Sequence, residues 1–190
     1  MNTRTPQPPA LVRAIDSLTG FVGKFVSWLT LIMVAVAAFN AIFRYIGRFI
    51  GVNLSSNAYI EMQWYMFSVV FLLGAAYALR EDSHVRVDVL YSRVSARTQH
   101  IINIAGTLIL LLPFSLFLLW VSYPIVRNSW LVREVSPDPG GLPRYPLKAL
   151  VVVCFVLLAL QGVSELIKEI QRLRAHVPAP EPDKPVEGSI

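Results

Sequence analysis

Four long apolar runs, each without a charged residue, dominate this sequence. A helix needs about 20 mainly apolar residues to cross the roughly 30 Å hydrocarbon core of a bilayer. Strands are excluded here, because an open strand in lipid would leave its backbone N–H and C=O groups unpaired. We therefore predict an all-α membrane protein with four transmembrane helices. The charge-free runs cover residues 25–43, 62–79, 101–126 and 149–164, and the expected spans are about 25–45, 60–80, 101–126 and 147–167.

The composition supports a membrane protein and excludes several other classes. The chain has 190 residues and is 55% hydrophobic and 15% charged, whereas a soluble domain is typically about 25% charged. Its single cysteine, Cys154, excludes an intrachain disulfide and paired-cysteine redox chemistry. The net charge of +5 comes from basic residues spread between the apolar runs, so we expect contact with membrane lipid and no nucleic-acid partner.

The distribution of Lys and Arg predicts the orientation of the helices, since cytoplasmic segments carry an excess of both. With four alternating spans, eleven of these residues fall on the side of the two termini and six on the other side. We therefore expect both termini in the cytoplasm. The eleven residues are Arg4, Arg13, Lys24, Arg80, Arg86, Arg93, Arg97, Lys168, Arg172, Arg174 and Lys184.

Proline-rich, polar segments lie near both ends of the chain and in one loop. Those near the ends predict disordered tails at residues 1–13 and 175–190, which flank one transmembrane domain at 14–174. Residues 136–146, between the third and fourth spans, are also rich in turn residues. Because the prolines of this outer loop restrict the backbone, they favour an ordered loop.

The connection between the second and third spans has the pattern of an amphipathic helix. An apolar stripe forms on such a helix, and three arginines gather elsewhere on its surface. A helix of this kind lies in the headgroup layer with its arginines toward anionic lipid; the alternative is a docking surface for a partner protein. The stripe is Val87, Leu90, Tyr91, Val94 and Ile101, and the arginines are Arg86, Arg93 and Arg97.

None of the four runs contains Asp, Glu, Lys, Arg or His. A charged group at the centre of a membrane helix costs about 2.5–3.5 kcal/mol on insertion scales and usually marks a transport pathway. The absence of such groups predicts that any pathway lies in another chain. The three histidines, His84, His100 and His176, lie outside the runs and lack the spacing of metal or haem ligands. We therefore expect no enzyme activity, cofactor or metal.

Several residues suit contacts between helices. Gly74 and Ala78 are small residues four apart, which lets another helix approach closely; packing within this chain explains them as well as an outside partner does. Gln161 could form a hydrogen bond across helices. Arg44 and Glu61 lie at the outer ends of consecutive spans, where they either pair or are solvated separately.

The segment 61–90 resembles a known family. Residues 61–64 (EMQW), 70–81 (VFLLGAAYALRE) and 84–90 (HVRVDVL) are similar to the small transmembrane subunit, of the DctQ type, of tripartite ATP-independent periplasmic (TRAP) transporters. The outer loop 136–143 (SPDPGGLP) and residues 160–162 (LQG) resemble one branch of that family. Together these motifs extend the resemblance over most of residues 14–168.

The resemblance implies a subunit of a bacterial inner-membrane importer. In that family a periplasmic protein captures an organic acid, a large membrane subunit carries it inward with the sodium gradient, and the small subunit supports the large one. The expected partners are therefore the large subunit, the periplasmic binding protein and lipid. A stand-alone four-helix exporter, another membrane accessory protein and a membrane enzyme are the alternatives. The candidate interface residues are Arg44, Glu61, Trp64, Gly74, Arg80, Glu81, His84, Arg86, Asp88, Arg93, Arg97, Asp138 and Arg144.

Overall fold

The structure is a computed structural model that describes residues 8–52, 56–83, 91, 94–138 and 140–175. The described residues form helices, apart from the loops and one isolated bridge between Val135 and Pro143. Four helices, counting α4, η1 and α5 as one continuous helix, are long and apolar enough to cross a membrane. This confirms the predicted fold class. The elements are α1 (Ala10–Ile50), α2 (Asn57–Arg80), α4 (Ala96–Ala105), η1 (Gly106–Leu111), α5 (Leu112–Leu131) and α6 (Tyr145–Ala175).

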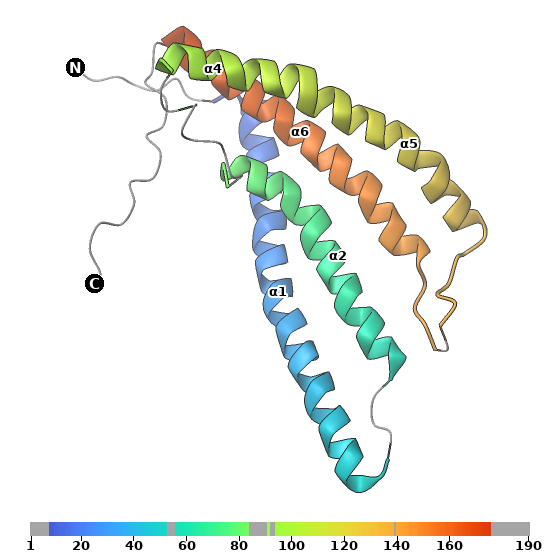
Figure 1. Ribbon diagram of the computed structural model, residues 1–190. Coiled ribbons are helices and arrows are strands. Elements are labelled where there is room, and N and C mark those ends of the chain that lie inside the picture. Colours follow the sequence, from blue (N-terminus) through green and yellow to red (C-terminus); the bar gives the residue numbers. More distant parts are fainter. Residues whose placement is uncertain (1–7, 53–55, 84–90, 92–93, 139, 176–190) are drawn as a thin grey trace, which may run out of the picture.

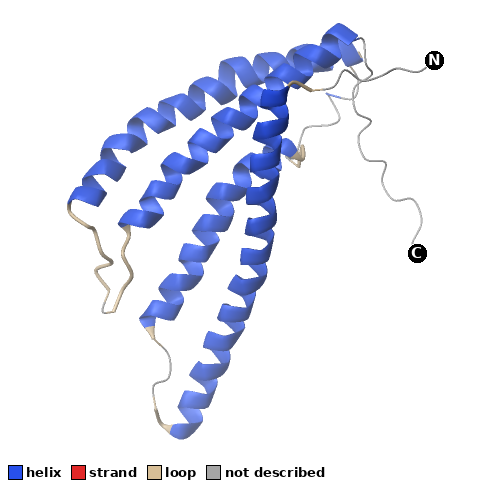
Figure 2. Cartoon of the chain, turned by 180° about the vertical axis from the view of Figure 1, so that it is seen from behind, coloured by secondary structure: helices blue, strands red, loops and turns tan. Residues whose placement is uncertain are grey.

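The long helices lie side by side as a fan-shaped layer, in the order α1, α2, α6, α5 (Figures 1 and 2). Helix α6 is the centre of this layer, because it packs against α1, α2, α4, η1 and α5. The start of α1, the end of α2, the start of α4 and the end of α6 lie at one end, here called the termini end (Figure 1). The opposite end, here called the loop end, carries the connections from α1 to α2 and from α5 to α6 (Figure 1).

The layer leaves most of its apolar surface exposed. In the most apolar window of α1, of α2 and of the α4–α5 helix only 6% of residues are buried within the chain, against 28% in α6. Large side chains such as Phe71, Leu110 and Trp120 are about two-thirds exposed or more. In water such a surface would be strongly unfavourable; in a bilayer, lipid or another membrane chain covers it.

Helix α1 is longer than the apolar run that predicted it. It begins at Ala10, inside the segment 1–13 that the sequence predicted to be a disordered tail. Val12, Ile15 and Thr19 explain the early start: they recur at helical spacing on one face and are all buried. At about 1.5 Å per residue, the 41 residues of α1 extend about 60 Å, twice the hydrocarbon thickness. Much of the additional length lies at the termini end.

The third spanning helix contains a short π-helical segment, η1. The N–H of Leu112 donates to the carbonyl of Thr107, five residues earlier, and Pro113 follows at once. Proline cannot continue the α-helical hydrogen-bond pattern and clashes with the preceding turn, so a wider turn at this position accommodates it. Figure 1 shows the combined α4–η1–α5 helix curving over α6.

Candidate functional site

Four of the predicted interface residues, His84, Arg86, Asp88 and Arg93, lie outside the described residues, as does most of the predicted interfacial helix. Three others are exposed at the surface: Arg44 on α1, Arg97 on α4 and Asp138 in the outer loop. Glu61, Trp64 and Arg144 take part in a polar cluster at the loop end of the layer. Arg80 and Glu81 lie at the termini end beside a second polar cluster, and Gly74 lies on α2 near Val26 of α1.

At the loop end, Glu61 fastens the outer loop to α2. Its side chain is buried, with 2% of the residue exposed. One carboxylate oxygen accepts a hydrogen bond from the Ser136 hydroxyl, and the other accepts one from the Leu142 backbone N–H at 2.5 Å. The hydrogen-bond partners of Glu61 therefore belong to the outer loop, and Arg44 is not one of them.

Further contacts order the same loop. Tyr65 on α2 donates to the Leu142 carbonyl at 3.1 Å, and the Arg144 guanidinium lies over the Trp64 ring, 5.9 Å from its centroid. Within the loop, the Ser136 N–H donates to the Leu142 carbonyl at 3.1 Å. The described residues of the outer loop therefore form a small hairpin held on the first turns of α2.

An ion pair closes the base of this hairpin. The Lys148 ammonium lies 2.5 Å from a carboxylate oxygen of Glu134, and the Ser129 hydroxyl donates to the same oxygen at 2.8 Å. The hydrogen bond from Lys148, followed by that from Ser129, holds the pKa of the Glu134 carboxyl below its ordinary value. Glu134 is therefore ionised at neutral pH and joins the end of α5 to the start of α6.

We predict that Glu61→Gln loosens the outer loop. The amide offers one acceptor oxygen where the carboxylate offers two, so either Ser136 or Leu142 loses its partner. Loss of a hydrogen bond to a charged group costs about 1.5–3 kcal/mol, which raises the open population of the loop roughly tenfold or more. Trypsin added to the detergent-solubilised protein should then cleave after Arg133 and Arg144 correspondingly faster.

Asp138→Asn is the matched control, since it removes a carboxylate from the exposed tip of the same loop. Its cleavage rate should equal that of the wild type. Equal rates in all three proteins would contradict the assigned role of Glu61.

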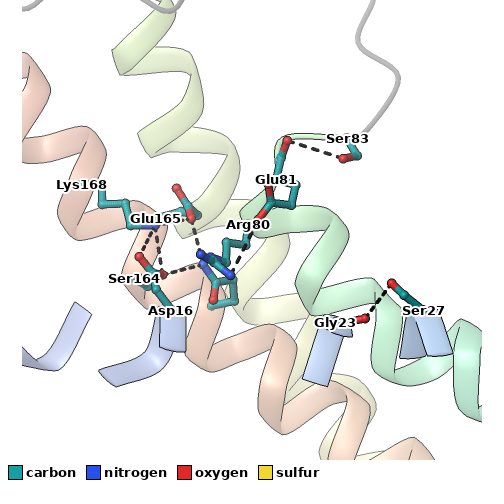
Figure 3. Close-up of polar contacts among 10 residues, drawn as sticks. Asp16, Gly23, Ser27, Arg80, Glu81, Ser83, Ser164, Glu165 and Lys168 are labelled. Atoms are coloured by element: carbon teal, nitrogen blue, oxygen red, sulfur yellow. Dashed lines mark hydrogen bonds and ion pairs between the residues drawn. The ribbon is translucent and has the colours of Figure 1, made fainter. Parts of the chain in front are cut away.

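At the termini end, a second cluster joins α1 to α6 (Figure 3). Asp16 on α1 accepts hydrogen bonds from Ser164 at 2.9 Å and Gln161 at 3.1 Å, and it pairs with the Lys168 ammonium at 2.8 Å. Lys168 and Gln161 also bind Glu165, each at 2.8 Å. Gln161 and Ser164 are fully buried. The hydrogen bond across helices that the sequence predicted for Gln161 is confirmed.

Next to this cluster, α1 and α2 come into close contact. The Arg80 guanidinium lies directly on Gly20, and the Tyr77 ring lies directly on Gly23, so that neither glycine has space for a side chain. Arg80 also lies 3.7 Å from Glu81, a distance too long for a strong ion pair (Figure 3). Gly74, which the sequence indicated as the small contact residue, has room: a Cβ there would lie 3.7 Å from Val26.

A third group of charges joins α4 to α6. The His100 Nδ1 lies 2.6 Å from a carboxylate oxygen of Glu169, and Arg172 donates to the other oxygen at 2.7 Å. His100 is 2% exposed. The sequence placed this histidine just outside a charge-free run, and the structure shows it buried against α6.

These groups contain charges whose structural role the sequence did not indicate. Asp16, Glu169 and Lys168 lie outside the charge-free runs, where solvation by headgroups and water is the simplest expectation. The available signal was helical spacing: Val12, Ile15, Asp16 and Thr19 lie on neighbouring positions of one face. Among the described residues, no three His, Cys, Asp or Glu side chains gather as metal ligands would. The clusters hold helices and a loop together, which is a structural role.

Comparison with known proteins gives two matches in sequence. The family model described as "Tripartite ATP-independent periplasmic transporters, DctQ component" matches residues 33–172. A protein of Oleidesulfovibrio alaskensis named "Isethionate TRAP transporter permease protein DctMQ" is 24% identical over 142 residues. The match covers 74% of this chain and 22% of that protein, which is therefore much longer. No solved structure matches.

Proposed function

Because the family model covers residues 33–172, this chain belongs to the DctQ component family of TRAP transporters, and we propose that it supports the large transport subunit of a sodium-coupled importer of organic acids. The members of this family are components of transporters, and the family is not one of enzymes. The chain is a multi-pass membrane protein, and we infer the bacterial inner membrane, with both termini in the cytoplasm, as its location.

The observation that carries this proposal is the exposed layer of charge-free helices. Residues 25–43, 62–79, 101–126 and 149–164 contain no charged side chain, so the chain has no charged group at mid-depth with which to bind an ion or a carboxylate substrate. Its charged clusters lie at the ends of the helices, and within each cluster the charged groups bind one another. A layer of this kind is suited to support a partner membrane chain that contains the transport pathway.

The relative from O. alaskensis supports a physical association. It is named a permease, and the region similar to this chain makes up only 22% of its length. When a segment of this kind is part of a longer permease polypeptide, it is tethered close to the rest of that polypeptide. We infer that the present chain makes the corresponding contact as a separate subunit.

The outer loop is our candidate for touching the periplasmic binding protein. It is ordered on Glu61, and its tip at Asp138 is exposed. An ordered loop loses little conformational entropy on binding, so it suits a transient contact.

Co-purification with the large subunit tests the proposal. Tagged chain, co-expressed with a large TRAP transporter subunit from the same organism, is expected to elute with that subunit as one complex from mild detergent. Liposomes that contain both chains and the binding protein should accumulate an organic acid when a sodium gradient is applied, whereas either membrane chain alone should not. A large subunit that is fully active alone and never binds this chain would refute the proposal. Transport by this chain alone would favour the exporter.

A further inference from the structure

Helix α1 carries an apolar stripe that is exposed along its whole length. Starting at Leu11, alternate steps of three and four residues reach twelve positions as far as Phe49, and all twelve are apolar and exposed. These positions are here called the outer stripe. Helix α1 forms one edge of the fan-shaped layer (Figure 1), so another chain can reach it. The first six positions of the outer stripe are Leu11, Ala14, Leu18, Phe21, Phe25 and Trp28.

The outer stripe is distinct from the face of α1 that packs within this chain. Val12 and Ile15 are buried and belong to the packed face. In the segment 10–24 the large apolar residues that stay exposed are Leu11, Leu18 and Phe21, and all three belong to the outer stripe. A helix with two apolar faces has two surfaces to cover, and the layer covers one of them.

Acyl chains of lipid do not reach the first part of the outer stripe. At about 1.5 Å per residue, the charge-free run 25–43 extends roughly 28 Å, which is close to the hydrocarbon thickness of a bilayer. On the same basis Leu18 lies about 10 Å and Leu11 about 21 Å before this run, beyond a headgroup layer of roughly 5–8 Å. These side chains are 46% and 58% exposed. Regularly spaced apolar side chains outside the bilayer indicate contact with a protein.

The spacing of the outer stripe indicates that this protein contributes a helix. Alternate steps of three and four residues have the average period of 3.5 that is typical of a coiled-coil seam, in which each side chain inserts between four residues of the facing helix. On a straight α-helix such a stripe drifts by about 20° in every seven residues, so the facing helix winds around α1 with a left-handed twist. The outer stripe runs the length of α1 and can accompany a helix that crosses the whole membrane.

The charges on α1 argue against a second copy of this chain as the partner. The exposed charged residues of this helix are all basic: Arg13, Lys24, Arg44 and Arg48. The carboxylate of Asp16 is already paired with Lys168. Two copies inserted in the same direction would pair their α1 helices in parallel about a twofold axis, so that equal positions face each other. Basic residues would then lie near their own copies, which is unfavourable.

We propose that the outer stripe of α1 binds a transmembrane helix of the large transport subunit. The inference rests on the proposed support function and names the surface through which it acts. In the relative from O. alaskensis the similar region is part of a longer permease polypeptide, whereas a separate chain needs a contact of this kind to hold its partner. The family model begins at residue 33. The part of the outer stripe before that residue can therefore lack a partner while another helix provides the support.

Photo-crosslinking in membranes tests this inference. The photoreactive residue p-benzoylphenylalanine replaces Leu18, Phe21 or Trp28 in the full chain, which is co-expressed with a tagged large TRAP transporter subunit from the same organism. Illumination should give a product with the mass of one copy of each chain. The control positions are Leu116 and Phe117 on α5, at the opposite edge of the layer, which are 59% and 55% exposed. The same probe at these positions should give no such product.

A pair of alanine variants provides a second, quantitative measurement. Leu18→Ala/Phe21→Ala shortens two side chains of the outer stripe outside the charge-free run, so insertion into the membrane should be unchanged. Because two buried apolar side chains are lost from the interface, the affinity between the purified chains in mild detergent should fall about tenfold or more. Leu116→Ala/Phe117→Ala is the matched control, since it removes the same two side-chain types from α5, and it should bind as the wild type does.

Three results would overturn the inference. In the first, the wild-type complex forms but cross-links only from α5 or from no position of the outer stripe; the proposed function would then stand with its contact elsewhere. In the second, the product has the mass of two copies of this chain. In the third, Leu18→Ala/Phe21→Ala, folded as judged by circular dichroism and a single elution peak, binds as tightly as the wild type. If this variant does not fold, the cross-links decide. If the wild-type chains form no complex at all, the proposed function fails together with this inference.

Discussion

Asp16→Ala is expected to detach α1 from α6 at the termini end and to lower the stability of the chain by about 2–3 kcal/mol. Three groups of α6 lose their common acceptor in this variant: the Ser164 hydroxyl, the Gln161 amide and the Lys168 ammonium. Breaking a fully buried ion pair costs about 3–5 kcal/mol. The loss expected here is smaller than that for a fully buried pair, because Lys168 keeps Glu165 as a partner and its side chain is 18% exposed.

Asp16→Asn separates the hydrogen bonds from the charge. The amide can still accept from Ser164 or Gln161, but it no longer neutralises Lys168, so this variant should lie between the wild type and Asp16→Ala. The measurement is unfolding in mixed micelles of mild detergent and sodium dodecyl sulfate, followed by circular dichroism. Asp138→Ala, at an exposed position of the outer loop, is the control. A loss of stability in Asp16→Ala no greater than that in the control would contradict the role of Asp16.

The four spans followed from the sequence because lipid imposes a simple rule on a helix: about 20 residues without a charge. The runs 25–43 and 62–79 lie within α1 and α2 for this reason. The ends of the helices obey no comparable rule. Beyond a charge-free run, water and headgroups solvate charged residues equally well in a helix and in a loop, so the charges do not show where the helix ends. The start of α1 at Ala10 depends instead on its packing against α6, which the sequence does not specify.

The arrangement as a fan-shaped layer was equally beyond prediction. In a soluble protein, the polar face of a helix indicates which side is buried. In a membrane the side facing lipid and the side facing another helix are both apolar, so residues such as Phe71 and Leu157 look alike in the sequence. Phe71 is 69% exposed and Leu157 is 8% exposed.

The sequence singled out Glu61 as an acidic residue at the outer end of the second span, where it could pair with Arg44 or be solvated separately. In the structure Glu61 is bound by the outer loop. Its partners, Ser136 and Leu142, lie 75 and 81 residues further along the chain. Contacts over such separations depend on the tertiary fold. The sequence therefore identified the residue and left its partner undecided.

Gly23→Ala is expected to disrupt the packing of α1 on α2. A Cβ at this position would lie within 3.0 Å of three atoms of the Tyr77 ring, including its Cγ. Because Cγ is only two bonds from the backbone, the ring cannot move away unless α2 moves as well. Forcing an additional carbon into a close contact costs about 1–3 kcal/mol. Unfolding in mixed micelles should show this loss, and the α1–α2 separation in spin-labelled protein should increase.

Two other glycines provide matched controls, since each Gly→Ala change brings the same gain in helix propensity, up to about 1 kcal/mol. Gly74→Ala should be neutral or stabilising, because its Cβ would make an ordinary contact of 3.7 Å with Val26. Gly20→Ala should fall between the two, because the atoms it meets belong to the far end of the Arg80 side chain, which can rotate away.

The double variant Gly23→Ala/Tyr77→Ala identifies the cause of the expected loss. Alanine at position 77 lacks the Cγ and the ring that oppose the new methyl group, so the two changes together should cost less than the sum of their separate effects. Strict additivity would mean that Gly23 and Tyr77 do not contact one another as described. Equal stability of Gly23→Ala and Gly74→Ala would remove the basis for close α1–α2 packing at this point.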